Sequence, residues 1–256
     1  MNKLLTRISY LETDSDWLIT LILDVSCKCI ARIRLPTTCA SCVALNKSEV
    51  KTLSKPKLNN PMLVEGLTNF EGLGQRVTQM LMERTKAVKF AELYSPHFPD
   101  FAIAGEDGLC HLPRYEFYTN PEFQPNIIVL TGSVQPLPEY TPGYYEVFET
   151  VFNYAFELGC KRFITFGNFV SRKPEREIYV ASTSEKLSKL VTERLGGKLF
   201  SKGRVDGLIG MILGIAQIHG CHGILILGAS TEGTPLETMS SPVFDYLLKV
   251  LEFKEK

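Results

Sequence analysis

The chain of 256 residues has no excess of charge of either sign, because 28 lysines and arginines balance 28 aspartates and glutamates. A protein that binds nucleic acid mainly through electrostatics needs a basic surface, so a net charge of zero argues against that class. The same balance leaves self-association unopposed by overall repulsion. We therefore expect no nucleic-acid partner and no barrier to a homo-oligomer.

Long apolar runs are also missing. The longest candidate, residues 17–25, is much shorter than the roughly 20 residues of a membrane span, and it contains Asp24. Acidic residues Glu12, Asp14 and Asp16 precede it, where a signal peptide would carry positive charge. We expect no membrane association, no secretory signal and a cytoplasmic location.

The seven cysteines do not suit a closed disulfide framework, since an odd number fits reduced thiols better. Cys27, Cys29, Cys39 and Cys42 could close a tetrahedral zinc site, although C-x-C is an uncommon half-site and the connection is short. Three other interpretations of residues 1–50 stay open: a poorly ordered extension, a β-hairpin on the edge of the main domain, or a wrongly assigned start site. Elsewhere we predict no metal and no other cofactor.

Residues 51–256 alternate short apolar runs with helical patterns, and we treat them as one domain after an N-terminal extension, residues 1–50. The hydrophobic fraction of 45% is ample for a core. Continuous apolar runs such as residues 127–130 are typical of buried strands, which lie in sheets covered on both faces. We predict a three-layer α/β/α fold with a mostly parallel central sheet. Its expected strands are residues 61–65, 88–94, 126–131, 162–166, 177–182 and 223–228.

Helix boundaries follow from capping residues. Residues 73–86 and 207–218 have helical patterns, and Thr141 with Pro142 begins a helix that Gly159 ends. The segment 182–185 has the form of a capping box that opens a helix to residue 195, and Pro242 marks the start of the last helix. Residues 105–108, which include Asp-Gly, predict an antiparallel hairpin.

Two glycine-rich corners follow predicted strands. Gly66, Gly72 and Gly74 lie between a strand and a helix, a geometry that can hold phosphate at a helix N-terminus. The loop has neither the Gly-Lys-Ser/Thr of a Walker A loop nor the third glycine of G-x-G-x-x-G, since Val77 takes that place. The alternative is a tight turn with close helix packing.

The second corner begins at Gly132, after the central apolar strand. Ligands of α/β sheets bind at the carboxyl ends of strands, so this corner is the predicted rim of a pocket or an interface. Gln135, Tyr140, Tyr144 and Tyr145 belong to the same rim. Clustered tyrosines suit an interface, but Tyr144 and Tyr145 could equally pack inward.

No catalytic constellation is visible in the sequence. Gly-x-Ser-x-Gly and His-Glu-x-x-His are both absent, and no acid–base pair stands out. His219, Cys221 and His222 are too close in sequence to converge easily on a metal. Small residues at Gly207, Gly210 and Gly214 indicate close packing of an apolar helix, within the layers or against another subunit.

Taken in order, these segments resemble the proteasome assembly chaperone family, in particular its archaeal members, over about residues 57–251. Each matching stretch is weak alone, and the ordered series is specific. The matching residues are 60–66, 72–74, 98–100, 112–113, 116–118, 127–132, 135–136, 143–146, 157–159 and 207–214.

The resemblance implies a phosphorylase-like α/β/α fold used without catalysis. It also implies a homo-oligomer that helps proteasome α-subunits, or another client, to assemble without ATP. Family members that dock on the proteasome ring carry a penultimate tyrosine, whereas this sequence ends in Phe253-Lys-Glu-Lys, which puts direct docking in doubt. The alternative function is an enzyme that binds a nucleoside or a phosphorylated small molecule at the glycine corners.

Overall fold

The computed structural model describes residues 45–67, 72–105, 107–137, 141–170, 177–205, 207–231 and 234–253, together with the backbone of three strands in the first 44 residues. The chain divides into two compact units, residues 1–44 and 45–256. The first unit is an antiparallel sheet of β1 (Ile8–Thr13), β2 (Asp16–Ile22) and β3 (Ile30–Arg34). The candidate zinc ligands Cys27, Cys29, Cys39 and Cys42 lie outside the described residues.

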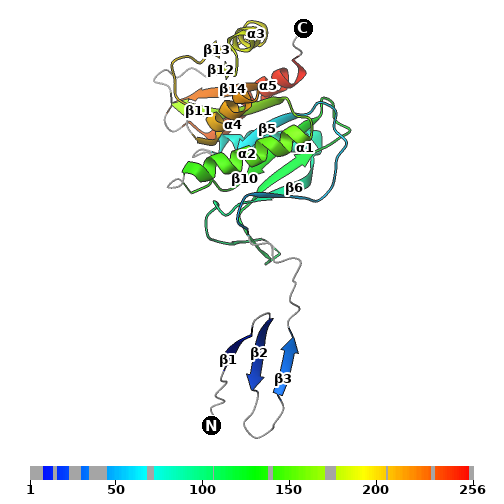
Figure 1. Cartoon of the computed structure of the whole chain (residues 1–256). Helices are drawn as coiled ribbons and strands as arrows, with labels where there is room; N and C mark the ends of the chain where they lie inside the picture. The colour runs from blue at the N-terminus through cyan, green and yellow to red at the C-terminus, as the bar shows by residue number, and fades with distance from the viewer. Residues whose placement is uncertain are drawn as a thin grey trace. The chain divides into compact units, whose positions relative to one another are not determined.

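The second unit is built on one large sheet with the strand order β13-β12-β14-β11-β5-β10-β9-β6-β4 (Figure 1). Its four central strands, β14, β11, β5 and β10, run parallel, and antiparallel strands continue the sheet on both sides. The strands are β4 (Glu49–Thr52), β5 (Met62–Leu67), β6 (Val88–Tyr94), β9 (Tyr115–Thr119), β10 (Ile127–Gly132), β11 (Arg162–Val170), β12 (Ile178–Ser182), β13 (Lys198–Leu199) and β14 (His222–Ser230).

Helices cover both faces of this sheet, which confirms the predicted three-layer α/β/α architecture. Alternate residues of a strand face opposite sides, so Leu63 packs toward α2 (Thr141–Glu157) and α4 (Gly207–Ile218). Met62 and Val64 pack on the other side, toward α1 (Leu73–Thr85), α3 (Glu185–Leu195) and α5 (Leu236–Glu252). Each side has its own buried apolar cluster. No described helix is long and apolar enough to cross a bilayer.

The predicted hairpin is present as β7 (Ile103–Ala104) and β8 (Cys110–His111), which pair antiparallel. Its turn contains Gly108 with φ +75°, the conformation that Asp-Gly turns require. Gly159 ends α2 as expected: its φ is +91°, and the amide of Cys160 donates to the carbonyl of Ala155. That pattern is a Schellman motif, which satisfies the last carbonyls of a helix.

Two predicted helix starts are wrong. Ser184, not Ser182, caps α3, because its side chain accepts a hydrogen bond from the Leu187 amide. The last helix begins at Leu236, so Pro242 lies inside it rather than at its start. Proline favours the first helical turn only as a tendency, and here the preceding turn is held by burial of Met239 against the sheet.

Candidate functional site

The first glycine corner brings strand β5 and helix α1 into backbone contact. A Cβ atom on Gly66 would lie 2.5 Å from the carbonyl oxygen of Gly74, and a Cβ on Gly74 would lie 3.0 Å from the carbonyl oxygen of Leu67. Gly72 precedes α1 with φ +69°, a left-handed conformation that favours glycine. Packing and turn geometry therefore account for all three glycines. The rest of the loop, residues 68–71, lies outside the described part of the chain.

The second corner lines a pocket of about 300 Å³ at the carboxyl end of β10. Gly132 allows the ring of Tyr115 to pass close by, since a Cβ there would lie 2.5 Å from its Cδ1 atom. Gln75, in the first turn of α1, donates from Nε2 to the Gly132 carbonyl at 3.0 Å. Arg114 and His111 line the same pocket. The carboxyl-end position agrees with the general rule for ligand sites in α/β sheets.

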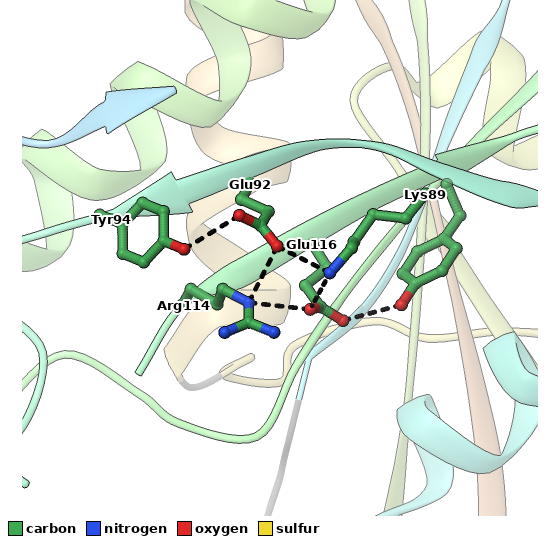
Figure 2. Close-up of polar contacts among 6 residues, drawn as sticks. Lys89, Glu92, Tyr94, Arg114 and Glu116 are labelled. Atoms are coloured by element: carbon green, nitrogen blue, oxygen red, sulfur yellow. Dashed lines mark hydrogen bonds and ion pairs between the residues drawn. The ribbon is translucent and has the colours of Figure 1, made fainter. Parts of the chain in front are cut away.

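Beside this pocket, a cluster of charged side chains joins β6 to β9, and we call it the charged cluster (Figure 2). Glu92 and Glu116 are partners in the strand register, so their carboxylates would repel without compensation. Figure 2 shows Lys89 and Arg114 between them. Lys89 Nζ lies 2.7 Å from a Glu92 oxygen and 3.0 Å from a Glu116 oxygen. Arg114 Nε lies 3.3 Å and 2.9 Å from the same two carboxylates.

Two tyrosines complete the charged cluster. The Tyr94 hydroxyl donates to Glu92 at 2.9 Å, and the Tyr118 hydroxyl donates to Glu116 at 2.8 Å (Figure 2). Burial alone would raise the pKa of each carboxyl, but these hydrogen bonds and the neighbouring cations outweigh it, so both pKa values lie below the usual range. Both carboxylates are therefore ionised and fully engaged at neutral pH, which suits a structural role better than a general base.

The charged cluster yields a prediction about acid stability. Glu116→Gln should lower the free energy of unfolding at pH 7 by about 1–2 kcal/mol, because two cations lose a shared carboxylate. A carboxyl with a lowered pKa stabilises the fold above its unfolded pKa and loses that effect as pH falls. The variant should thus lose less stability than the natural protein between pH 5 and pH 3, as measured by urea unfolding.

The matched control for that prediction is Glu149→Gln on α2, since Glu149 is exposed. This variant should keep both the stability and the acid dependence of the natural protein. Equal behaviour of the two variants would mean that the charged cluster contributes nothing specific.

On the opposite face of the sheet lies a second polar pair, Glu65 of β5 and Tyr115 of β9, both fully buried. Glu65 Oε1 accepts a hydrogen bond from the Leu67 amide at 2.8 Å. Within the described part of the chain, Glu65 Oε2 and the Tyr115 hydroxyl have no hydrogen-bond partner. Burial raises the pKa of Glu65 to about 8, and the Leu67 amide offsets only part of that shift. Glu65 is therefore protonated at neutral pH. Burial raises the pKa of the Tyr115 hydroxyl as well, and the carboxylate form of Glu65 adds to that increase.

The tyrosines of the predicted rim differ in their burial. Tyr144 is half-buried and packs against the core beneath α2, whereas Tyr145 is exposed. Gln135 is half-buried in the segment that follows β10. Tyr140 lies outside the described residues. The two adjacent tyrosines of α2 thus take opposite roles, one in the core and one on the surface.

The three glycines of α4 also differ from one another. A Cβ on Gly210 would collide with the carbonyl oxygen of Val205, so this glycine permits a close approach. Gly207 has φ +66° at the start of the helix, and no other atom lies near the place of its Cβ. Gly214 likewise faces open space. The helix itself packs against α2, β11 and β14.

Four exposed apolar residues belong to the β7–β8 hairpin or to the segments that directly flank its strands. We call this surface the apolar hairpin; it consists of Phe101, Ile103, Leu109 and Leu112, whose side chains are 39–59% exposed. Two of them, Ile103 and Leu112, also line the pocket beside the charged cluster. Exposed apolar side chains that cluster, rather than occur singly, mark interaction surfaces.

Sequence reasoning found the hairpin but neither its exposed apolar surface nor the charged cluster. A signal for the cluster was present in strand β9, where polar Glu116 and Tyr118 alternate with buried Tyr115, Phe117 and Thr119. That period of two predicts a polar face on a half-covered strand. In the described residues, no group of three His, Cys, Asp or Glu side chains could hold a metal ion.

Comparison with known proteins matches this chain to a family and to a relative. The model of the PAC2 family matches residues 63–254. The uncharacterised protein MJ1210 of Methanocaldococcus jannaschii is 31% identical over 173 residues, which are 67% of this chain and 66% of that protein. The match thus spans slightly less than two thirds of the relative's length.

Solved structures agree with the family match. The crystal structure of Pyrococcus furiosus PbaB, described as an archaeal proteasome activator, superposes with a TM-score of 0.74 at 26% identity, over 82% of this chain and 91% of that one. P. furiosus PbaA, described as an archaeal homologue of proteasome-assembly chaperone, shares the fold with a TM-score of 0.66 at 21% identity, over 82% and 88% of the two chains. These matches confirm the resemblance drawn from the sequence, and the chain belongs to the PAC2 family.

Proposed function

We propose that this protein is a non-enzymatic scaffold of the cytoplasm that assists proteasome assembly or activity through protein–protein contacts and without ATP. The observation that carries the proposal is the likeness to PbaB, an archaeal proteasome activator, which extends over 82% of this chain at 26% identity. We further propose that the scaffold is a homo-oligomer. The balanced charge of the chain leaves such association unopposed.

The apolar hairpin is the surface that we assign to the proteasome α-subunit. Apolar side chains at the centre of an interface supply most of its binding energy once water is excluded. Leu109 and Leu112 are each more than half exposed, although they belong to an otherwise well-packed unit. Leu109 and Leu112 lie directly before and directly after the short strand β8, outside the large sheet, so a partner can cover them without unfolding that sheet.

The proposal is tested by native mass spectrometry of the protein with purified proteasome α-subunits, with and without ATP. We expect a homo-oligomer that gains α-subunit mass equally in both conditions. A monomer would contradict the oligomer, and a requirement for ATP would contradict the mechanism. A homo-oligomer that does not bind α-subunits would contradict the proposal that the proteasome is the client.

A matched pair of variants tests the apolar hairpin. Leu109→Glu places a charge in the proposed interface and should weaken α-subunit binding by at least about tenfold, because a carboxylate would be buried without a partner. Val88→Glu makes the same change at a similarly exposed apolar residue on β6, away from the hairpin, and should leave binding unchanged. Equal losses in the two variants would remove the hairpin from the interface.

A further inference from the structure

The carboxylates of the charged cluster have no acceptor to spare, whereas its arginine keeps donors. Both oxygens of Glu92 and both oxygens of Glu116 already accept a hydrogen bond or an ion pair from Lys89, Arg114 or a tyrosine hydroxyl. A guanidinium has five N–H groups, and Arg114 reaches the two carboxylates with its Nε alone. A ligand that meets the charged cluster in the neighbouring pocket must therefore supply acceptors.

The terminal nitrogens of Arg114 are the donors in question. Figure 2 shows both of them turned away from the two carboxylates. Toward the residues that the structure describes, Arg114 makes its polar contacts through Nε only. Its side chain is 19% exposed and lines the pocket of about 300 Å³. The contacts of Nε thus hold the guanidinium in place, and its outer edge carries parallel N–H groups into a largely enclosed space.

Thr131 adds a hydroxyl on the same face of the sheet. It is the register partner of Glu116 where β10 pairs with β9, so its side chain projects from the face that carries the charged cluster. Thr131 lines the pocket, and no described residue makes a hydrogen bond with its hydroxyl. A hydroxyl of this kind can donate to the same ligand that Arg114 binds.

The remaining wall of the pocket is apolar. Ile103 and Leu112 of the apolar hairpin both line it. The volume lies at the lower end of the range of about 300–1,000 Å³ that is typical of small-molecule sites, so the ligand must be short. The position at the carboxyl end of β10 is where ligands of α/β sheets bind. Donors on one side and apolar side chains on the other complement a ligand with an acceptor head group and a short apolar body.

We propose that this pocket binds a carboxylate that carries a short apolar group, with the carboxylate on the terminal nitrogens of Arg114 and the apolar group against Ile103 and Leu112. A carboxylate is planar and accepts two parallel hydrogen bonds from one edge of a guanidinium. Phosphate fits less well, because its second negative charge would lie close to two carboxylates that the cations of the cluster only balance. Two sources offer this chemistry: a free short-chain acid and the last residue of a protein chain.

The test is isothermal titration of the full chain with isocaproate, a free acid, and with N-acetyl-leucine, which reproduces the end of a protein chain. We expect one molecule to bind per chain, at least about tenfold more tightly than N-acetyl-leucine amide, acetate or inorganic phosphate. The tighter of the two acids identifies the source. Binding of neither acid, or equal binding of the amide or of phosphate, would overturn the proposal. The titration uses this protein alone, so its result does not depend on the proposed proteasome client.

Two variants and a control locate the site. Arg114→Lys keeps a positive charge beside both carboxylates but removes the paired N–H groups, and should weaken binding by about tenfold. Thr131→Val keeps the shape of the side chain without the hydroxyl, and should bind several-fold more weakly. Arg84→Lys makes the first change at an exposed residue in the last turn of α1, and should bind as the natural protein does.

Thermal unfolding of each variant shows whether it is folded before it is titrated. If Arg114→Lys is folded and binds both acids as tightly as Arg84→Lys does, the assignment of the carboxylate to Arg114 is wrong. If Arg114→Lys does not fold, Thr131→Val decides, and equal binding by Thr131→Val and Arg84→Lys would overturn the site.

Discussion

Glu65→Gln should make the protein more stable at pH 8 and flatten the dependence of its stability on pH. The reason is the buried carboxyl of β5, whose pKa is raised from 4.5 to about 8 by burial. Between these two values the folded state holds a proton that the unfolded chain has released. The free energy of unfolding therefore falls as pH rises through this window, by about 1.4 kcal/mol per pH unit from this group.

Glutamine keeps the carbonyl oxygen that the Leu67 amide requires and does not ionise. At pH 5, where Glu65 is already protonated in the fold, the variant and the natural protein should differ little. At pH 8 the variant should be more stable by up to about 4 kcal/mol, because the pKa rises from 4.5 to about 8 and each pH unit in that window is worth about 1.4 kcal/mol. Urea unfolding at pH 5, 6.5 and 8 measures the difference.

Glu149→Gln, at an exposed position of α2, is the matched control and should follow the natural protein at every pH. The window of Glu65 is separate from that of the charged cluster, whose carboxyls have lowered pKa values and act at acid pH. Parallel pH profiles for Glu65→Gln and the natural protein would show that Glu65 is not a buried protonated acid.

The layers of the fold could be predicted because each depends on a local pattern. The apolar run of β10 and the apolar helix α4 can each be recognised within about a dozen residues. The antiparallel side of the sheet could not be predicted in this way, because β9 pairs with β6 across a separation in sequence that no local pattern encodes. Strand β4, Glu49–Thr52, joins the same edge and crosses the boundary that was expected between residues 50 and 51.

The sites depend even more on the pairing of strands that are distant in sequence. Glu92 and Glu116 meet only because the register of β6 and β9 makes them neighbours, with a β-bulge after Lys89 that shifts the alternation. Glu65 looked like the polar end of a short strand. It is buried because β5 continues to Leu67 at the centre of the sheet, with β10 on one side and β11 on the other. Burial of a charged residue follows from its position in the sheet, which the sequence of one strand does not specify.

Gly66→Ala should destabilise the protein severely, by about 3 kcal/mol or more. The new Cβ would lie 2.5 Å from both the Gly74 carbonyl oxygen and the Thr78 hydroxyl, distances that side-chain rotation cannot relieve at the backbone atom. Helix α1 would have to move away from β5, and its buried residues Val77 and Leu81 would lose their packing. Loss of that contact removes apolar burial along the whole inner face of the helix.

Gly214→Ala is the matched control, because it adds the same methyl group to an α4 position where nothing lies within 4 Å. Alanine favours a helix over glycine by about 1 kcal/mol, so this variant should be as stable as the natural protein or slightly more so. The double variant Gly66→Ala/Thr78→Ser removes the Thr78 methyl group but keeps the Gly74 carbonyl, and it should recover little stability. Full recovery there would mean that the strand–helix contact rests on the Thr78 side chain and not on the approach of the two backbones. Thermal and urea unfolding of the three variants measure these differences.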